Sequence, residues 1–232
     1  MTVLAPQRGA GVMLTAEHTL STVGWLAGEA PEFRDRLLSI ARWRKYRAGD
    51  DIYLAGDEAN GVFGLEKGRV DVSIPISADE WVTMHRAQPG FWIGDSALFS
   101  GQPRGVSVVT HDECLILTIP ALPLKRMLEE HPHDYLCFYR LTHANTMQTL
   151  RVLAETIALP PRARFARMLL RLTSRDGVVG ATQSELGALA GMSRAAFRRA
   201  FSELIEKGVV KMEYGAVRIL DMEALQREVD TP

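Results

Sequence analysis

Residues 134–159 lie in the longest stretch of the chain without glycine or proline, and this stretch divides the sequence into three zones. Pro132 precedes it and Pro160-Pro161 ends it, as expected for a helix because proline cannot continue one. Apolar residues recur along it at steps of three and four. The stripe consists of Leu136, Tyr139, His143, Thr146/Met147, Leu150, Leu153/Ala154 and Ile157, most of which are apolar. This long, narrow stripe favours pairing with a second copy of the chain, as in a coiled coil. The alternative is a helix packed along its own β-domain.

The zone before this helix has the pattern of a β-structure. Between residues 45 and 120, short apolar runs are interrupted by glycines. Val70, Val72, Ile74 and Ile76 alternate with other residues, which predicts a half-buried strand. A similar period is carried by Val106, Val108, Leu115, Leu117 and Ile119. Many short strands with frequent turns predict a sandwich, roll or barrel. Residues 23–43 precede them as short helices with Trp25, Leu26, Phe33, Leu37, Leu38 and Ile40 on one apolar face.

The zone after the long helix contains the sharpest local motif, at residues 182–206. Thr182 and Glu185 form a capping box that opens a short helix. Gly191 permits a turn with positive φ, and Ser193 caps a second helix. Residues 209–220 then predict two strands around Tyr214-Gly215. Together these signals predict a winged helix-turn-helix, with an ordinary helical hairpin as the alternative.

The second helix of this motif separates an apolar face from a basic one. Phe197, Ala200, Phe201 and Leu204 follow the spacing of a core-facing stripe. The opposite side carries arginines whose planar guanidinium groups can pair with guanine O6 and N7 in a major groove. The residues predicted to contact DNA are Thr182, Gln183, Ser193, Arg194, Ala195, Arg198, Arg199 and Ser202.

The charge distribution agrees with a polyanionic partner at the C-terminal end. Residues 160–220 contain eleven Lys and Arg against five Asp and Glu, although the net charge of the whole chain is −1. A basic segment on an acidic body is typical of nucleic-acid binding, and a solvated basic helix is the alternative.

Three motifs in this order resemble the family of the cAMP receptor protein and the fumarate–nitrate reduction regulator, the Crp/Fnr family. They are the run of residues 46–72, the segment of residues 89–105 and the helix-turn-helix, and the resemblance covers residues 37–225. The resemblance implies an α+β fold: an N-terminal jelly-roll-like β-roll of the cyclic-nucleotide-binding type, a dimerisation helix and a winged helix-turn-helix. The expected domains are residues 1–131, a sensor with N-terminal helices; residues 132–159, the dimerisation helix; and residues 160–232, the DNA reader.

The resemblance also implies an effector site in residues 89–105, where the family holds a phosphate and a ribose hydroxyl. These roles would fall to Gly94, Asp95, Ser96, Ala97, Arg104 and Gly105, and Thr149 matches a position that touches the base. Three residues depart from the family's pattern. Asp95 replaces a longer glutamate, Gly105 a hydroxyl-bearing residue and Leu150 a polar one. The effector is therefore left open: a cyclic nucleotide, another signal, or a segment kept only as structure, with Arg104 pairing Asp95 or solvent. In the reading helix, Ala195 stands where the family often has a glutamate that accepts from cytosine, which predicts a different operator.

These features predict a transcription regulator that is not an enzyme. Its partners would be double-stranded DNA with a pseudo-palindromic operator, a second copy of the chain and RNA polymerase, without a membrane. Only two cysteines are present, so no iron–sulfur cluster is expected, and no metal site is predicted. The start of the chain lacks the pattern of a secretion signal, which favours the cytoplasm. The alternatives are a cyclic-nucleotide sensor that regulates a protein partner and a jelly-roll enzyme.

Overall fold

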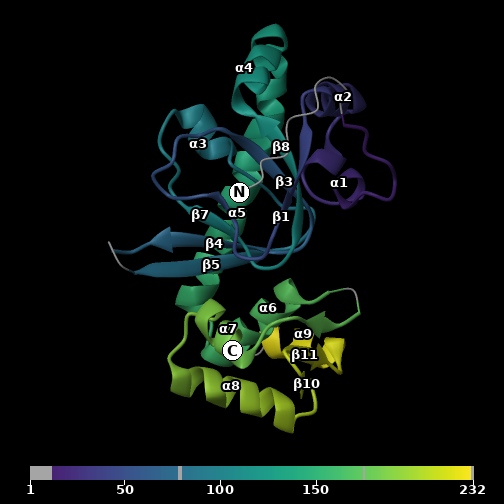
Figure 1. The fold of residues 1–232 in the computed structure, drawn as a ribbon. Coiled ribbons are helices and arrows are strands. Elements are labelled where there is room, and N and C mark those ends of the chain that lie inside the picture. Colours follow the sequence, from purple (N-terminus) through teal and green to yellow (C-terminus); the bar gives the residue numbers. More distant parts are fainter. Residues whose placement is uncertain (1–11, 78–79, 175, 231–232) are drawn as a thin grey trace. The chain divides into compact units, whose positions relative to one another are not determined.

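The computed structural model describes residues 12–77, 80–174 and 176–230, and the chain divides into two compact units, Met1–Asn145 and Thr146–Pro232. The division falls within the long helix α5 (Tyr135–Ala158), which is drawn in teal to green in Figure 1. Two parts of the sequence analysis lie outside the described residues. They are residues 1–11, which lack the pattern of a secretion signal, and Arg175, one of the eleven Lys and Arg of residues 160–220. No described helix is long and apolar enough to cross a membrane.

Two antiparallel sheets form the body of the N-terminal unit, as the alternation predicted. In the first, the order is β1 (Arg42–Tyr46), β8 (Cys114–Pro120), β3 (Gly61–Lys67) and β6 (Trp92–Ile93). In the second, the order is β2 (Asp51–Tyr53), β7 (Ser107–Thr110), β4 (Val70–Pro75) and β5 (Trp81–Ala87). Val70 and Val72 are buried as predicted. Including Ile76 in that strand was wrong: β4 ends at Pro75, and Ile76 is exposed in the turn that follows.

Short helices cover the first sheet and converge on the start of α5. They are α1 (Thr19–Thr22), η1 (Leu26–Gly28), α2 (Pro31–Ser39), α3 (Asp95–Ser100), α4 (Ala121–Glu130) and η2 (Pro132–Asp134). The ring of Phe138 on α5 lies within 5.7 Å, centroid to centroid, of the rings of Trp25, Phe33 and Phe99. Such aromatic contacts add to the free energy gained by burying apolar area. The first turns of α5 are therefore fixed against the β-roll.

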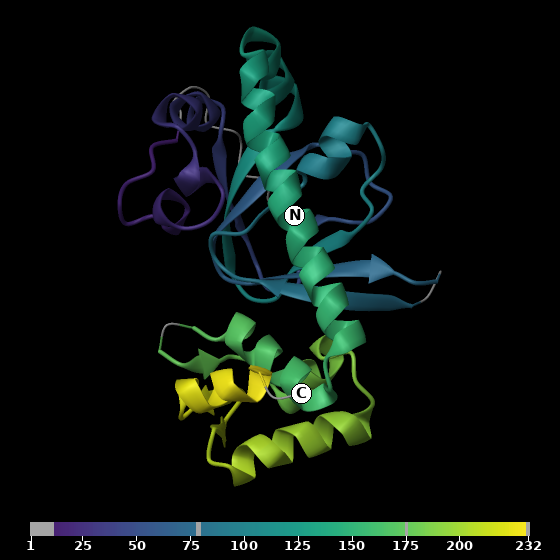
Figure 2. The same ribbon diagram turned by 180° about the vertical axis from the view of Figure 1, so that it is seen from behind.

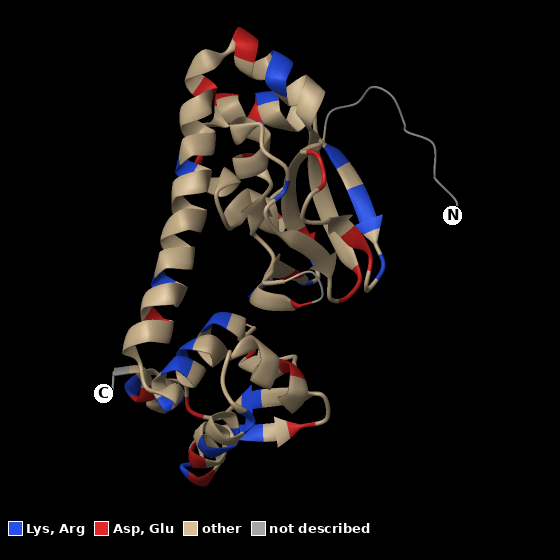
Figure 3. Cartoon of the chain, turned by 90° about the vertical axis from the view of Figure 1, so that its left-hand side faces the viewer, with Lys and Arg blue, Asp and Glu red and all other residues tan. Residues whose placement is uncertain are grey.

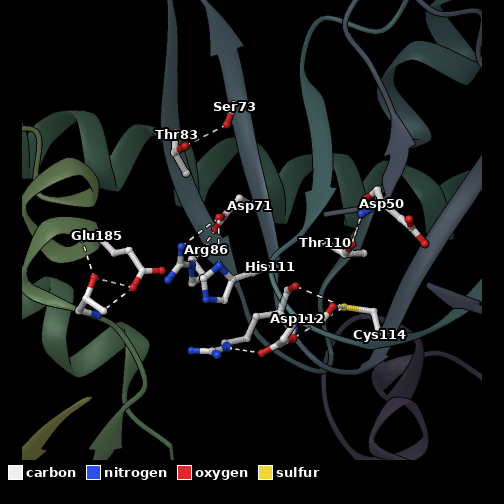
Figure 4. Close-up of polar contacts among 12 residues, drawn as sticks. Asp50, Asp71, Ser73, Thr83, Arg86, Thr110, His111, Asp112, Cys114 and Glu185 are labelled. Atoms are coloured by element: carbon white, nitrogen blue, oxygen red, sulfur yellow. Dashed lines mark hydrogen bonds and ion pairs between the residues drawn. The ribbon is translucent and has the colours of Figure 1, made fainter. Parts of the chain in front are cut away.

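A partly buried ion pair links two strands of the second sheet, and the sequence did not identify it. Arg86 on β5 donates to both carboxylate oxygens of Asp71 on β4, at 2.7 and 2.9 Å (Figure 4). The imidazole Nδ1 of His111 lies 3.6 Å from the same carboxylate. A buried charge is tolerated only when it is paired in this way, so this cluster is part of the fold.

Helix α5 has two apolar faces, and the residues that the structure describes cover one of them. Cys137, Phe138 and Leu141 are buried against the N-terminal unit. The predicted stripe instead remains open to solvent in the single chain. Its exposed large apolar members are Leu136, Tyr139, Met147, Leu150, Leu153 and Ile157. The helix begins at Tyr135, one residue later than predicted, because Pro132–Asp134 form a 3₁₀ turn.

The C-terminal unit is a small helical domain with a three-stranded sheet (Figure 2). Its elements are α6 (Pro161–Leu172), β9 (Val178–Val179), α7 (Gln183–Leu189), α8 (Arg194–Glu206), β10 (Val210–Glu213), β11 (Ala216–Ile219) and α9 (Met222–Asp230). Its core forms around Phe165, whose ring makes edge contacts with Phe197 and Phe201 of α8 at 5.2 and 5.7 Å. This packing fixes which side of α8 faces outward.

Candidate nucleic-acid interface and effector cassette

Helices α7 and α8 begin at the two caps that the sequence predicts. The Thr182 hydroxyl accepts from the backbone N–H of Glu185, and the Glu185 carboxylate accepts from the backbone N–H of Thr182. The Ser193 hydroxyl accepts from the backbone N–H of Ala196. Between the helices, Gly191 has a φ of 56°, which is unfavourable for other residues. Local chemistry therefore sets the angle between the two helices.

The outer face of α8 carries the side chains that were predicted to contact DNA. Phe197, Ala200, Phe201 and Leu204 are buried beneath it, as expected from their spacing. All eight predicted contact residues are exposed, six of them on α8 or at its cap and Thr182 and Gln183 at the start of α7. The structure thus brings this whole set to the surface of one motif.

The charges of the C-terminal unit divide into a paired and an unpaired group. Figure 3 shows Lys and Arg, in blue, spread over this part of the chain. Several of them lie beside carboxylates: Arg162 with Glu203 and Glu228, Arg167 and Arg171 with Glu155, Lys207 with Glu228, and Arg218 with Glu213. Among the described residues, Arg194, Arg198 and Arg199 have no hydrogen bond or ion pair. The outer face of α8 therefore carries three arginines that no described carboxylate neutralises.

A hairpin of β10 and β11 follows α8 and forms the predicted wing. Gly215 turns the chain with a φ of 67°, and the side chain of Tyr214 at the tip is fully exposed. The third strand, β9, pairs with β11 through Val179 and Val217, both buried. This strand was not predicted, because two residues are too few for a visible alternation.

The segment that resembles an effector site folds as a turn and the short helix α3, and we call residues 94–105 the cassette. Gly94 has a φ of 108°, and a Cβ there would lie 2.8 Å from the Gly61 oxygen, so only glycine fits. Asp95 and Arg104 are both buried, whereas Ser96 and Gly105 are exposed. The structure brings these cassette residues together. Thr149 lies on the part of α5 that belongs to the other unit.

The partners of Arg104 differ from those expected. Its Nη1 donates to the Gly94 oxygen at 2.7 Å, and its Nη2 donates to the Gly61 oxygen at 2.8 Å and to Asn60 Oδ1 at 3.2 Å. The guanidinium carbon lies 4.2 Å from the centre of the Tyr53 ring, a cation–π contact. In the alternative that kept the cassette only as structure, Arg104 was to pair Asp95 or solvent; the structure instead gives its protons to two backbone oxygens and to Asn60.

Asp95 is bound from the long helix. The Thr142 hydroxyl donates to Asp95 Oδ2, and the Asn145 amide donates to the backbone oxygen of Trp92 at 3.1 Å. Burial raises the pKa of the Asp95 carboxyl, while the bonds from Thr142 and from the backbone N–H groups of residues 95 and 96 oppose that rise. Burial also lowers the pKa of the Arg104 guanidinium. Sequence reasoning missed Thr142 and Asn145, which carry no motif and show their role only through contacts.

Two families match the chain in these same regions. The cyclic nucleotide-binding domain matches residues 43–131, and the Crp-like helix-turn-helix domain matches residues 163–228. Among the described residues, no group of three or more His, Cys, Asp and Glu side chains could hold a metal ion.

Curated relatives match over most of their length. The cyclic AMP receptor protein of Thermus thermophilus is 30% identical over 207 residues, covering 86% of this chain and 93% of that protein. The transcriptional regulator LdrP of the same species is 26% identical over 196 residues, covering 80% of this chain and 95% of that protein.

Solved structures show the same fold. The c-di-GMP responsive global regulator CLP of Xanthomonas campestris superposes with a TM-score of 0.67 at 19% identity, covering 83% of this chain and 100% of that chain. FixK2 of Bradyrhizobium japonicum superposes with a TM-score of 0.71 at 16% identity, covering 81% and 96%.

Proposed function

The chain belongs to the Crp/Fnr family of transcription regulators, and from that membership we propose that it binds a pseudo-palindromic operator as a homodimer. It combines a DNA-binding helix-turn-helix with a sensor domain of the cyclic nucleotide-binding type. In each copy, α8 would enter a major groove, where an exposed helix of this width fits. Expected domain roles are sensing by residues 1–131, dimerisation by residues 132–159 and DNA reading by residues 160–232.

One observation carries the DNA-reading proposal: among the described residues, the three arginines of α8 have no carboxylate partner, whereas several other basic side chains of this unit do. A guanidinium group that already binds a carboxylate must lose that bond before it can contact DNA. Arg194, Arg198 and Arg199 have no such bond to lose among the described residues. Thr182, Gln183, Ser193, Ala195 and Ser202 surround them as further contacts to bases or phosphates.

The uncovered stripe of α5 supports the homodimer. Leu150 and Leu153 are about half exposed and Ile157 is 79% exposed in the single chain. Exposed apolar side chains at heptad-like spacing gain free energy when a second helix covers them. Two-fold symmetry then requires half-sites about one helical turn apart. A regulator of this kind works in the cytoplasm beside RNA polymerase, and we assign it no enzymatic reaction.

A signal would reach DNA through the junction of α5 and α6. Leu159-Pro160-Pro161 separates the two helices. Glu155 on α5 accepts from Arg167 and Arg171 on α6, and Arg164 donates to the Thr156 oxygen at 3.1 Å. A change in the position of α5 would therefore be transmitted to α6, on which α8 packs.

The test begins with selection of a binding site from random duplex DNA by the full chain. Fluorescence anisotropy titrations then compare the wild type with Arg199→Ala and Arg198→Ala on the selected duplex. Loss of a bidentate contact to guanine should raise the Kd of Arg199→Ala about 10- to 100-fold, since one contact contributes about 1–3 kcal/mol.

The matched control is Arg126→Ala, which removes the same charge from an exposed position on α4. Its operator Kd should change less than twofold, and the melting temperature of all three variants should match that of the wild type. Wild-type affinity in both α8 variants would show that this face does not read the groove.

A further inference from the structure

The ionic groups of the cassette are already bound by the chain's own atoms. Arg104 is 3% exposed and Asp95 is 2% exposed. Arg104 donates to Gly94, Gly61 and Asn60, and Asp95 accepts from Thr142. A buried charge needs such partners in any state of the protein. The hydrogen-bond partners of Arg104 and Asp95 all come from the protein itself, while the Nε–H of Arg104 is buried without a partner among the described residues.

Three N–H bonds of the Arg104 guanidinium group are already used within the chain, which limits how it could bind a phosphate. A guanidinium group has five N–H bonds. Both protons of Nη2 are taken, by the Gly61 oxygen and Asn60 Oδ1, and one proton of Nη1 is taken by the Gly94 oxygen. A bidentate grip on phosphate needs two adjacent N–H bonds. The Nε–H lies beside Nη2, whose protons are committed, so Arg104 cannot form that grip without breaking an existing bond.

The guanidinium group of Arg104 is also packed tightly by neighbouring atoms of the chain. A Cβ added at Gly94 would lie 2.9 Å from Arg104 Nη1, which shows how closely the guanidinium packs against the turn. On its other side, the guanidinium lies against the Tyr53 ring at 4.2 Å. Gly105 adds no hydroxyl to hold a phosphate oxygen. Arg104 and Gly105 therefore do not offer the bidentate contact and the hydroxyl that would hold the phosphate of a cyclic nucleotide.

We propose that the cassette is closed to cyclic nucleotides and acts as a permanent latch between the β-roll and helix α5. Thr142 holds Asp95, and Asn145 holds the backbone of Trp92 in β6, the strand just before the cassette. In this arrangement, contacts within the chain hold the start of α5 against the β-roll, so no ligand is needed to hold it there. The DNA consequence rests on the proposed function: operator affinity is independent of cyclic nucleotides.

The first test uses the full-length wild-type protein with 3′,5′-cyclic AMP and 3′,5′-cyclic GMP at millimolar concentrations. A ligand that binds only the native state must raise the melting temperature. We expect no change in melting temperature and no change beyond twofold in operator Kd. A saturable rise with either nucleotide overturns the closed cassette, whether or not DNA binding is seen. Loss of operator binding in every condition would instead overturn the proposed function.

The second test addresses the latch itself. Thr142→Val keeps the shape of the side chain but leaves the buried Asp95 carboxylate without its hydroxyl donor, so its melting temperature should fall by about 5 °C. Thr142→Ser retains the hydroxyl and should restore most of the loss. Thr156→Val is the control, because the Thr156 hydroxyl donates only to the Val152 oxygen of its own helix.

The operator Kd of the same three variants shows whether the position of α5 against the β-roll affects DNA binding. Loss of the latch should raise the operator Kd of Thr142→Val at least fivefold, while Thr142→Ser and Thr156→Val stay within twofold of the wild type. Two results would overturn the proposed latch. One is an equal loss of melting temperature in Thr142→Val and Thr156→Val, and the other is a Thr142→Ser protein whose melting temperature is as low as that of Thr142→Val. A Thr142→Val protein that fails to fold leaves the nucleotide titration of the wild type as the deciding measurement.

Discussion

Arg104 and Arg199 carry the same guanidinium group in opposite surroundings. Arg104 is buried against an aromatic ring and gives its protons to backbone oxygens. Arg199 lies exposed on α8 without a bond to any described residue. The first arrangement orders a turn of the protein, and the second leaves a donor group available to a partner. The surroundings of each arginine, and not its identity, decide between a structural role and a recognition role.

Asp95 makes a pH-dependent contribution to stability. Its pKa is raised in the folded state by burial, so the native protein holds a proton over a pH range in which the unfolded chain has released it. That contribution is present below the unfolded pKa and is lost as pH rises through the folded value. Asp95→Asn removes the ionisation. The variant's free energy of unfolding, relative to the wild type, should therefore fall as pH is lowered from 7.5 to 4.

Urea unfolding of both proteins across this pH range measures the difference directly. The slope cannot exceed about 1.4 kcal/mol per pH unit for one proton. The neighbours of Asp95 keep their charge states over the range: Arg104 stays protonated, and burial raises the pKa of Tyr53, which stays neutral. A difference between the two proteins that does not vary with pH would show that Asp95 has no raised pKa.

At the scale of single elements, the start of α8 depends on one hydroxyl. Ser193→Ala removes the acceptor for the backbone N–H of Ala196 and should lower the free energy of unfolding by about 1 kcal/mol. Ser202→Ala, on the exposed side of the same helix, has no hydrogen bond to lose among the described residues and should change it by less than about 0.5 kcal/mol. Chemical denaturation followed by circular dichroism provides both values. Equal losses would mean that the Ser193 cap does not stabilise α8.

The exposed stripe of α5 predicts the oligomeric state. Leu150→Glu with Leu153→Glu places two charges where the second helix would pack, and these charges should convert the dimer to monomers. Arg151→Glu, an exposed position outside the stripe, is the control and should remain dimeric. Light scattering after size-exclusion chromatography measures the mass. Dimers that persist in the double variant would show that the stripe is not the interface.

Sequence patterns predicted the elements whose signals are local, and they failed where a contact joins distant segments. The caps at Thr182 and Ser193 and the turn at Gly191 depend on neighbouring residues, so their chemistry could be predicted. The partners of Arg104 are backbone oxygens, which have no sequence signature. Thr142 lies on α5 outside the predicted apolar stripe. The spacing of that stripe carries no information about the opposite side of the helix, so the contact of Thr142 with Asp95 could not be predicted.

For the whole molecule, charge and symmetry set the terms of DNA binding. The chain has a net charge of −1, while its C-terminal third is basic, so attraction to phosphate is expected at the reading unit. Each phosphate contact releases counterions, so the operator Kd should rise steeply with salt. Titrations between 50 and 200 mM potassium chloride should give a linear plot of log Kd against log salt. A flat plot would exclude phosphate contacts as a main source of affinity.

The two-fold arrangement makes the separation of the half-sites a measurable constraint. Inserting five base pairs between the half-sites turns one of them to the opposite side of the duplex, since a full turn takes about 10.5 base pairs. A dimer joined through α5 cannot then place both copies of α8 in their grooves. The Kd should therefore rise roughly a hundredfold, toward the non-specific level. Duplexes with scrambled half-sites provide that level. Equal affinity for the native and the five-base-pair-expanded operator would mean that each α8 binds its half-site alone, and that the pairing of α5 does not contribute to recognition.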